Sequence, residues 1–475
     1  MKLDQVYIDG AFQPAQSVGD FEIINPATGL GIGTLALSGA ADAERAVAAA
    51  RAAFDGWAAT PVAERKAALE RIVAAYQARK QDLADAMTTE MGAPTKMSMA
   101  AQYGAGEGHL KDFVNAIDKI EWVKTPDVGD GTDRIMQEPM GVCVLITPWN
   151  WPMNQITLKV GAALAAGCTV VLKPSELSPL SAEVFAEIMH AADIPPGVFN
   201  MVFGTGPDLG EALVRHPDVA CVSLTGSTRA GAAVSHAAAD DIKRVSLELG
   251  GKGACLVFPD ADPEKAGTAI ARSMFYNTGQ SCNAPSRLLA HRDIYDAVVA
   301  AAKQVAEAQT YGDPADPATR MGPLANRAQF ERVKSFLETG KAEAELVAGG
   351  NTADTGGFFV EPTVFAGVSN DMTVAREEIF GPVLSIIPFD TEEEAIAIAN
   401  DSPYGLAAYL WTNDVERAQR VSRKLRSGMV RLNGTDIPFG APFGGYGKSG
   451  IGREGGVWGI EEFLEVKAVS GWLDS

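Results

Sequence analysis

The stretch GVCVLITPWNWPMNQITLKVGAALAAGCTVVLKPSE, residues 141–176, contains two short apolar segments that each end at a proline. They are GVCVLITP (141–148) and CTVVLKP (168–174), and an apolar stretch of helical length separates them. Near-continuously apolar strands that alternate with helices are typical of a parallel sheet covered by helices on both faces. The stretch therefore predicts a strand–helix–strand unit of a doubly wound α/β fold.

The same alternation continues on both sides of this unit. Ahead of it, residues 40–58 and 62–87 are rich in Ala, Glu and Arg, and their apolar residues recur at three- and four-residue spacing, which predicts amphipathic helices. Three more apolar segments that end in glycine follow: FNMVFG (199–204), ACVSLTG (220–226) and RVSLELGG (244–251). A second series of apolar segments and helices after Gly250 predicts a second α/β domain.

Two segments do not fit this alternation. Residues 120–137 hold two short extended pieces around a turn rich in Gly and Asp, which predicts a hairpin. Residues 461–472, EEFLEVKAVSGW, place Leu464, Val466 and Ala468 on one face of a strand. An isolated strand of this kind needs a partner strand.

The composition excludes several classes of function. The chain has 475 residues and a formal net charge of −20, which argues against general binding to nucleic acid or to an anionic membrane. The N-terminus lacks a signal pattern, and the apolar run from Val160 is too short to span a membrane. The five cysteines form no CxxC pair and the five histidines are scattered, so we expect no metal site and a cytoplasmic protein with reduced thiols.

Three glycine clusters are candidates for phosphate binding. GLGIG, from Gly29, precedes a predicted helix but does not follow a convincing strand. VFGTGPDLG (202–210), which contains Gly206, is a near miss of the G-x-G-x-x-G pattern between a strand and a helix. VSLTGSTRAG (222–231) also links a strand to a helix, where backbone N–H groups at a helix N-terminus can bind an anion. Each cluster could equally be an ordinary strand–helix turn.

An acidic residue about 20 positions after such a glycine cluster is expected to bind the ribose of a dinucleotide. Glu248 has this spacing from Gly226. Glu176, close to Lys173 at the end of a different predicted strand, is a rival candidate. The spacing alone leaves both assignments open.

Cys282 differs from the other cysteines in its surroundings. It lies in NTGQSCNAPSR (277–287), a polar segment with the composition of a loop, whereas Cys143, Cys168, Cys221 and Cys255 lie in apolar runs. A thiol in such a loop is either an inert surface group or a nucleophile that the site activates.

Together these stretches resemble the aldehyde dehydrogenase superfamily over essentially the whole chain. The resemblance is carried by motifs that occur in the order of the family: TPWNWP (147–152), KPSE (173–176), LTGSTRAG (224–231), LELGGK (247–252), GQSC (279–282), EEIFGP (377–382) and APFGGYGKSGIGRE (441–454). One departure is Leu224, where the family commonly has phenylalanine; we expect this residue to pack in a strand.

The resemblance implies two doubly wound α/β domains and a small β domain for oligomerisation. Residues 1–118 and 138–248 are expected to form the dinucleotide-binding domain, and residues 249–448 the catalytic domain. The hairpin at 119–137 and the C-terminal segment 449–475 are expected to form the oligomerisation domain. A homo-oligomer, either dimer or tetramer, follows from this organisation.

The resemblance also assigns the chemistry to three residues. Cys282 matches the nucleophile that attacks the aldehyde carbon, and Asn150 matches the side-chain donor to the resulting oxyanion. Glu248 matches the general base that activates water to hydrolyse the thioester. A nearby nicotinamide cation and a helix N-terminus would lower the pKa of such a thiol below its reference value of about 8.5.

The implied cofactor is NAD, with NADP as an alternative. A carboxylate at Glu176 suits the free ribose hydroxyls of NAD and would repel a 2′-phosphate. The cofactor-binding candidates are Trp149, Lys173, Glu176, Gly206, Gly226, Ser227, Glu378 and Phe380. The candidates for a pocket that binds the aldehyde, a small molecule, are Trp151, Gln155, Leu158, Ser281, Asn283 and Phe439.

Two other functions compete with oxidation of an aldehyde to the acid. A CoA-acylating enzyme would pass the thioester to CoA, but relatives of that type generally lack a glutamate at the position of Glu248. A non-catalytic protein that keeps the fold to bind NAD would not need Cys282, Glu248 and Asn150 together.

Overall fold

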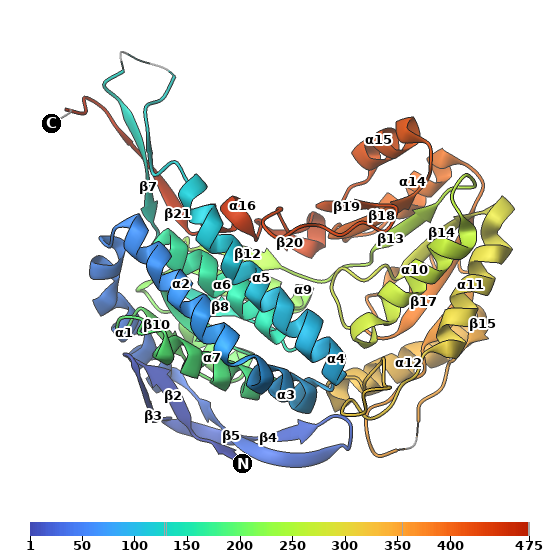
Figure 1. Ribbon diagram of the computed structural model, residues 1–475, viewed down its shortest axis with the longest axis horizontal. Coiled ribbons are helices and arrows are strands. Elements are labelled where there is room, and N and C mark those ends of the chain that lie inside the picture. Colours follow the sequence, from blue (N-terminus) through green and yellow to red (C-terminus); the bar gives the residue numbers. More distant parts are fainter. Residues whose placement is uncertain (128, 130, 354, 474–475) are drawn as a thin grey trace.

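The computed structural model describes residues 1–127, 129, 131–353 and 355–473. Two large mixed sheets, each with helices on both faces, form the body of the molecule (Figure 1). Each sheet has a core of parallel strands; the first sheet has antiparallel strands at both edges, and the second has one at a single edge. Within the described residues, no helix is both long and apolar enough to cross a bilayer.

The first large sheet has eight strands. In spatial order they are β20 (Gly450–Ile451), β12 (Arg244–Glu248), β11 (Val219–Thr225), β8 (Val142–Ile146), β9 (Thr169–Lys173), β10 (Phe199–Met201), β2 (Gln5–Ile8) and β3 (Ala11–Pro14). The strands from β12 to β10 are parallel, which confirms the strand–helix–strand unit predicted for residues 141–176. The connecting helix is α6 (Pro152–Ala166), which begins at a proline, as helices often do.

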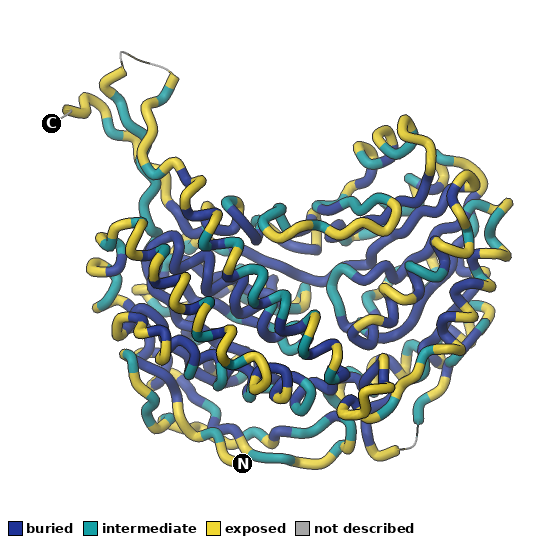
Figure 2. Tube along the Cα trace, viewed as in Figure 1, coloured by how far each residue is buried: buried dark blue, intermediate teal, exposed yellow. Residues whose placement is uncertain are grey.

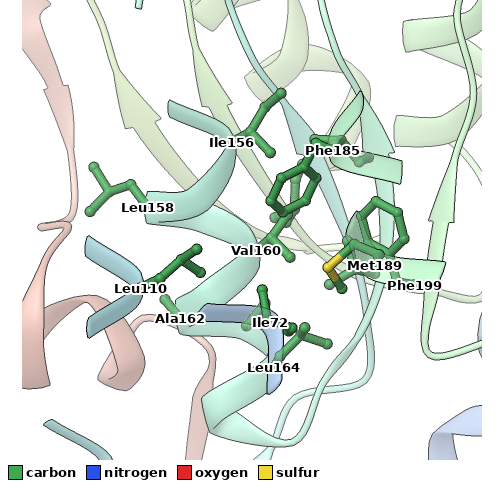
Figure 3. Packing of buried hydrophobic residues seen from close by; sticks show 14 of the residues in the cluster. Ile72, Leu110, Ile156, Leu158, Val160, Ala162, Leu164, Phe185, Met189 and Phe199 are labelled. Carbon is green, nitrogen blue, oxygen red and sulfur yellow. The ribbon is translucent and has the colours of Figure 1, made fainter. Parts of the chain in front are cut away.

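Alternate residues of these strands face opposite cores, as the period of a strand requires. Val142 and Val144 pack against α1 (Ala40–Ala58), α8 (Glu211–Val214) and α9 (Thr228–Ala239). Cys143 and Leu145 pack on the other face. The helices of that face are α2 (Val62–Ala78), α3 (Lys80–Met91), α5 (Tyr103–Ala116), α6 and α7 (Pro179–Ala191). Figure 3 shows Val160 of α6 beside Phe185, Met189 and Phe199 in this core.

The second large sheet has seven strands and a parallel centre. In spatial order they are β15 (Glu345–Ala348), β16 (Thr363–Ala366), β17 (Val383–Phe389), β14 (Arg287–His291), β13 (Ala254–Val257), β18 (Ala407–Trp411) and β19 (Met429–Leu432). One face carries α10 (Pro263–Phe275) and α11 (Tyr295–Ala308). The other carries α12 (Arg327–Glu343), α13 (Thr373–Arg376), α14 (Glu392–Asn400) and α15 (Val415–Lys424). The second α/β series predicted after Gly250 is therefore confirmed.

Two three-stranded sheets complete the fold. One contains β1 (Lys2–Leu3), β5 (Leu30–Ser38) and β4 (Ser17–Asn25). The other contains β6 (Val123–Lys124), β7 (Arg134–Pro139) and β21 (Leu464–Val469), and it projects from the body at the upper left of Figure 1. The predicted hairpin and its partner strand are thus present; Val128 and Asp130 of the predicted turn lie outside the described residues.

The C-terminal segment contributes to more than one of these sheets. β20 pairs with β12 of the first large sheet, and α16 (Gly456–Glu461) contacts α5 and α6. β21 pairs with β7 over Leu464–Val469, in register with residues 139 to 134. The division of the chain into three domains remains a proposal, because residues 449–475 connect two of the sheets.

Two local expectations were wrong. Residues 62–87 do not form one helix: α2 ends at Ala78 and α3 begins at Lys80, because Arg79 leaves the helical conformation with φ −109° and ψ 22°. GLGIG does not lead directly into a helix, because Leu30–Ser38 forms β5 and pairs antiparallel with β4. That glycine cluster lies in a sheet and is not a phosphate-binding turn.

Candidate functional site

A cleft of about 300 Å³ lies between the two large sheets. The residues that follow the carboxyl ends of β8, β11 and β12 meet on one side of it, where ligands of open α/β sheets bind. Residues ahead of β14 and β17 form the opposite side. The lining consists of Pro148, Trp149, Asn150, Thr225, Gly226, Ser227, Leu249, Gly250, Cys282, Gln329, Arg332, Glu378 and Phe380.

Cys282 is half-buried in this lining. Burial raises the pKa of its thiol far above the ordinary value, and the negative charges of Glu248 and Glu378 raise it further. Backbone hydrogen bonds at Cys282 and Asn283 oppose this rise. The protein alone therefore does not lower the pKa of this thiol as expected. The expected helix N-terminus is not at Cys282 either, because Cys282 follows a short turn, Tyr276–Gly279, and does not start a helix.

Asn150 is buried between β8 and the start of α6. Its side-chain Nδ2 donates a hydrogen bond of 2.9 Å to the carbonyl oxygen of Gln280, two residues ahead of Cys282. The indole N–H of Trp151 donates a second bond, of 2.8 Å, to the hydroxyl of Ser281. The turn before α6 is thus tied to the segment that carries the thiol. A primary amide has two N–H groups, so Asn150 retains a second donor.

Glu248 is the last residue of β12 and is 2 % exposed. Neither of its carboxyl oxygens has a hydrogen-bond partner in the described part of the chain. Burial, and then the negative charge of Glu454, raise the pKa of this carboxyl well above 4.5. Glu454 itself forms a buried ion pair with Lys159, whose Nζ also donates to the Ser223 hydroxyl at 3.0 Å. A buried carboxyl of raised pKa has the properties of a general base.

Glu378 and Phe380 belong to the loop that precedes β17. The carboxylate of Glu378 accepts a hydrogen bond of 2.9 Å from the backbone N–H of Gly251. The ring of Phe380 meets the ring of Trp149 edge to face, with centroids 5.6 Å apart, across the cleft. These contacts join the two sides of the cleft through three residues that the sequence motifs predicted.

Gln329 and Arg332 also line the cleft, and the sequence did not indicate them. Both lie on α12 and hold the Glu378 loop. The Gln329 side chain donates to the carbonyl oxygens of Ile379 and Phe380 at 2.9 and 2.8 Å, and Arg332 donates to the carbonyl of Glu378 at 2.7 Å. They lie about 50 residues from the EEIFGP motif, on an amphipathic helix most of whose other polar residues are exposed, so no local pattern marks them.

Two strand–helix turns could hold a phosphate-containing ligand. Gly226 and Ser227 lie between β11 and α9, and the Ser227 hydroxyl caps the helix by accepting a hydrogen bond from the Ala230 N–H. At the end of β9, Lys173 is buried, and its ammonium lies 3.6 Å from the Glu176 carboxylate. Burial lowers the pKa of Lys173, and the charge of Glu176 opposes that effect.

Gly206 lies in the turn after β10, which neighbours β9 in the sheet. No heavy atom approaches within 4 Å of the position that a Cβ would take at Gly206 among the described residues. Lys173, Glu176 and Gly206 do not line the 300 Å³ cleft itself. They lie beyond it along the same sheet edge.

The structure separates the six residues predicted to bind the aldehyde. Trp151 and Ser281 are hydrogen-bonded to each other beside Cys282. The backbone carbonyl of Asn283 accepts a hydrogen bond from the Tyr409 hydroxyl. The half-exposed ring of Phe439 packs edge to face on His109 of α5, with centroids 4.9 Å apart.

The other two residues of that set face the protein interior. The Gln155 side chain accepts a hydrogen bond of 2.9 Å from the hydroxyl of Thr225. Leu158 is 2 % exposed and packs in the core of the first large sheet, near Leu110 (Figure 3). The structure does not bring either of them to the cleft.

The fold and the cleft define an α/β enzyme with a thiol in a cleft where nucleotides bind in open α/β folds. Comparison with known proteins identifies the family. The sequence profile of the aldehyde dehydrogenase family matches residues 12–469, so the chain belongs to this family. A 3-succinoylsemialdehyde-pyridine dehydrogenase of a Pseudomonas species is 48% identical over 99% of both chains.

Solved structures agree with this assignment. An aldehyde dehydrogenase from Bartonella henselae is 44% identical, with a TM-score of 0.97, and the alignment covers 99% of this chain and 100% of that one. A mutant of aldehyde dehydrogenase C from Pseudomonas syringae, in complex with NAD+ and octanal, is 46% identical with a TM-score of 0.97 and coverage of 99% and 97%. The predicted family and fold class are confirmed.

Proposed function

We propose that this protein oxidises an aldehyde to the carboxylic acid with NAD+ and water, through a thioester on Cys282. The observation that carries the proposal is the arrangement around the cleft. Cys282 and Asn150 line it together, and the buried carboxyl of Glu248 lies close enough for its charge to raise the pKa of the thiol. A nucleophile and an oxyanion donor in the lining of the cleft, with a buried base outside that lining, are the parts that this reaction needs.

The residues of the cleft suit a dinucleotide. Gly226 and Ser227 offer the N-terminus of α9 to a pyrophosphate, and Glu378 offers a carboxylate to ribose hydroxyls. Lys173 and Glu176, at the neighbouring strand end, suit the hydroxyls of the second ribose. When bound, the nicotinamide supplies the hydride acceptor. The carboxylate of Glu176 favours NAD+ over NADP+, since it would repel a 2′-phosphate.

The protein residues carry the remaining steps. The thiolate of Cys282 attacks the aldehyde carbon and forms a tetrahedral oxyanion, which the free N–H of the Asn150 amide stabilises. Loss of hydride from this adduct leaves a thioester on Cys282. Glu248 then takes a proton from water, which attacks the thioester and releases the acid. Burial raises the pKa of Glu248, which makes its carboxylate a stronger base.

We further propose that the protein works as a homo-oligomer in the cytoplasm. The projecting sheet of β6, β7 and β21 bears exposed apolar side chains, Val123 and Val466, and could join a second copy. Five free thiols suit a reducing compartment.

The proposal is tested by NADH formation with a panel of aldehydes, with and without CoA. We expect the wild-type protein to form NADH without CoA, and Cys282→Ala to form none while still binding NAD+, measured by quenching of protein fluorescence. Strict dependence on CoA would replace the hydrolytic reaction with an acylating one. NADH formation by Cys282→Ala at the wild-type rate would refute the covalent mechanism.

A further inference from the structure

The turn that precedes Cys282 has an uncommon backbone conformation. Asn277, Thr278 and Gly279 have φ angles of 51°, 56° and 71°, so three consecutive residues are left-handed. A buried threonine in this region is strained, and such strain persists where surrounding contacts hold it. At Gly279 a Cβ would lie 2.1 Å from the Gly381 carbonyl oxygen, so this turn packs directly on the loop of Glu378 and Phe380.

The side chain of Asn277 connects this turn to Asn150. Asn277 is buried, and its Nδ2 donates to the backbone carbonyl of Asn150 at 2.9 Å and to the carbonyl of Gln280 at 3.1 Å. The Gln280 carbonyl is the same oxygen that accepts the side-chain N–H of Asn150 at 2.9 Å. Asn277 therefore holds both ends of the contact between the oxyanion donor and the segment that carries the thiol.

A second amide reaches the same point from a distant part of the chain. Gln102 ends a π-helical turn, Ser98–Gln102, and its Nε2 donates to the Asn150 carbonyl at 3.2 Å and to the Asn277 Oδ1 at 3.5 Å. Its own Oε1 is buried with no hydrogen-bond partner within the described residues. π-Helical turns occur frequently at functional sites. Asn277 is thus itself oriented by Gln102.

We propose that Asn277 is a positioning residue that sets the direction of the Asn150 amide toward the substrate oxyanion. The inference rests on the proposed function. One N–H of Asn150 is fixed on Gln280, so the direction of the other depends on how Asn150 and Gln280 are placed relative to each other. Asn277 fixes that placement by bonding to both residues. A catalytic group displaced by about 1 Å can lose about 10²-fold in rate.

The test is a double-mutant cycle between Asn277 and Asn150. Glycine adopts the left-handed conformation without strain. Asn277→Gly therefore removes the two side-chain hydrogen bonds and leaves the backbone conformation of the turn favourable. The readout is the rate of NADH formation in a single turnover at saturating NAD+. We expect Asn277→Gly to lower this rate by about 10- to 100-fold, with NAD+ affinity unchanged.

Asn150→Ala alone should lose about 10²–10³-fold. Because Asn277 acts through Asn150, the double variant should be no slower than Asn150→Ala alone, within about threefold. The proposal is overturned if the rate losses of the two single variants multiply in the double variant. It is also overturned if Asn277→Gly reacts at the wild-type rate. If wild-type protein oxidises no aldehyde, the proposed function fails together with this inference; an active wild type with an unaffected Asn277→Gly fails this inference alone.

Two further variants guard against a general disturbance of the turn. Thr278→Val removes a buried bond of 3.0 Å to the Gly322 carbonyl but leaves the Asn277 contacts, so it should lower stability and keep the rate within about threefold. If Asn277→Gly does not fold, Asn277→Asp replaces it, because aspartate keeps the size and tolerates the left-handed conformation but presents oxygen to two carbonyls. A rate equal to that of wild type in a folded Asn277→Asp would also refute the proposal.

Discussion

Cys282 and Glu248 both have pKa values that favour their uncharged forms. Burial is the main cause for each, and the negative charges of Glu248 and Glu378 strengthen the effect on the thiol. The isolated protein therefore holds the nucleophile as a thiol near neutral pH, and burial disfavours the ionised form of the base. A cation bound in the cleft would favour both ionised forms, so we expect cofactor binding to promote activation of the thiol.

Glu248→Gln is predicted to separate the two halves of the reaction. Glutamine keeps the size of the side chain but cannot take a proton from water. We expect a burst of about one NADH per subunit, followed by slow steady turnover, because hydrolysis of the thioester is impaired. Stopped-flow absorbance of NADH measures this. A missing burst would mean that Glu248 also takes part before the thioester forms.

At the scale of single residues, the sequence was informative where a motif is contiguous. Cys282, Asn150, Glu378 and Phe380 lie in short motifs, and the structure brings them to one cleft. Other residues reach the site only through contacts that are distant in sequence. Gln102 bonds to Asn150, 48 positions away, and to Asn277, 175 positions away. Gln329 on its helix bonds to a loop residue 50 positions away. Periodicity and local composition hold no information about such contacts.

At the scale of elements, the break at Arg79 brings α3 against α7. The Arg79 guanidinium binds Asp82 of α3 and, at 2.6 Å, Glu187 of α7. Helical propensity favours a continuous helix across residues 62–87, so tertiary contacts override a local preference here. The strands were predicted correctly for a different reason. Successive residues of a strand pack alternately into two hydrophobic cores, so nearly every residue of the strand is apolar.

Glu90 near the end of α3 caps the start of α7. Its buried carboxyl accepts hydrogen bonds from the backbone N–H groups of Leu180 and Ser181 and from the Ser181 hydroxyl. Burial raises its pKa from 4.5 to about 8, although these hydrogen bonds oppose the rise. This cap holds the start of the helix that follows the KPSE turn.

A dependence of stability on pH follows from Glu90. Between pH 4.5 and 8 the folded protein keeps a proton on Glu90 that the unfolded chain has released, so stability falls as pH rises through this window. Glu90→Gln carries no titrating proton and should show a flatter decline of Tm between pH 5 and pH 8. Differential scanning fluorimetry of both proteins tests this. Parallel Tm curves would show that Glu90 does not titrate in this range.

At the scale of the whole molecule, the projecting sheet consists mainly of exposed and half-buried residues (Figure 2). β21 pairs along its full length with β7, which leaves its other edge as the border of a three-stranded sheet. Val466 on this strand is 69% exposed. An open edge and an apolar surface on the same element favour association with another chain.

Val466→Asp is predicted to weaken self-association without unfolding the protein, because a charge there opposes burial in an interface. Val18→Asp is the matched control, since Val18 is 66% exposed on β4, outside the projecting sheet. Light scattering after size exclusion should give two or four times the chain mass of 49.9 kDa for the wild type and the control. The same mass for Val466→Asp would exclude this surface from the interface.

The proposed mechanism requires that the aldehyde carbon becomes covalently attached to the sulfur of Cys282. The most direct measurement is mass spectrometry of peptides from Glu248→Gln, quenched in acid during turnover with NAD+ and an aldehyde that the wild-type protein oxidises. We predict an acyl adduct on the peptide that contains Cys282, with the mass of the corresponding acid minus water. NADH formation in the same sample with an unmodified Cys282 peptide would contradict a covalent mechanism through this thiol.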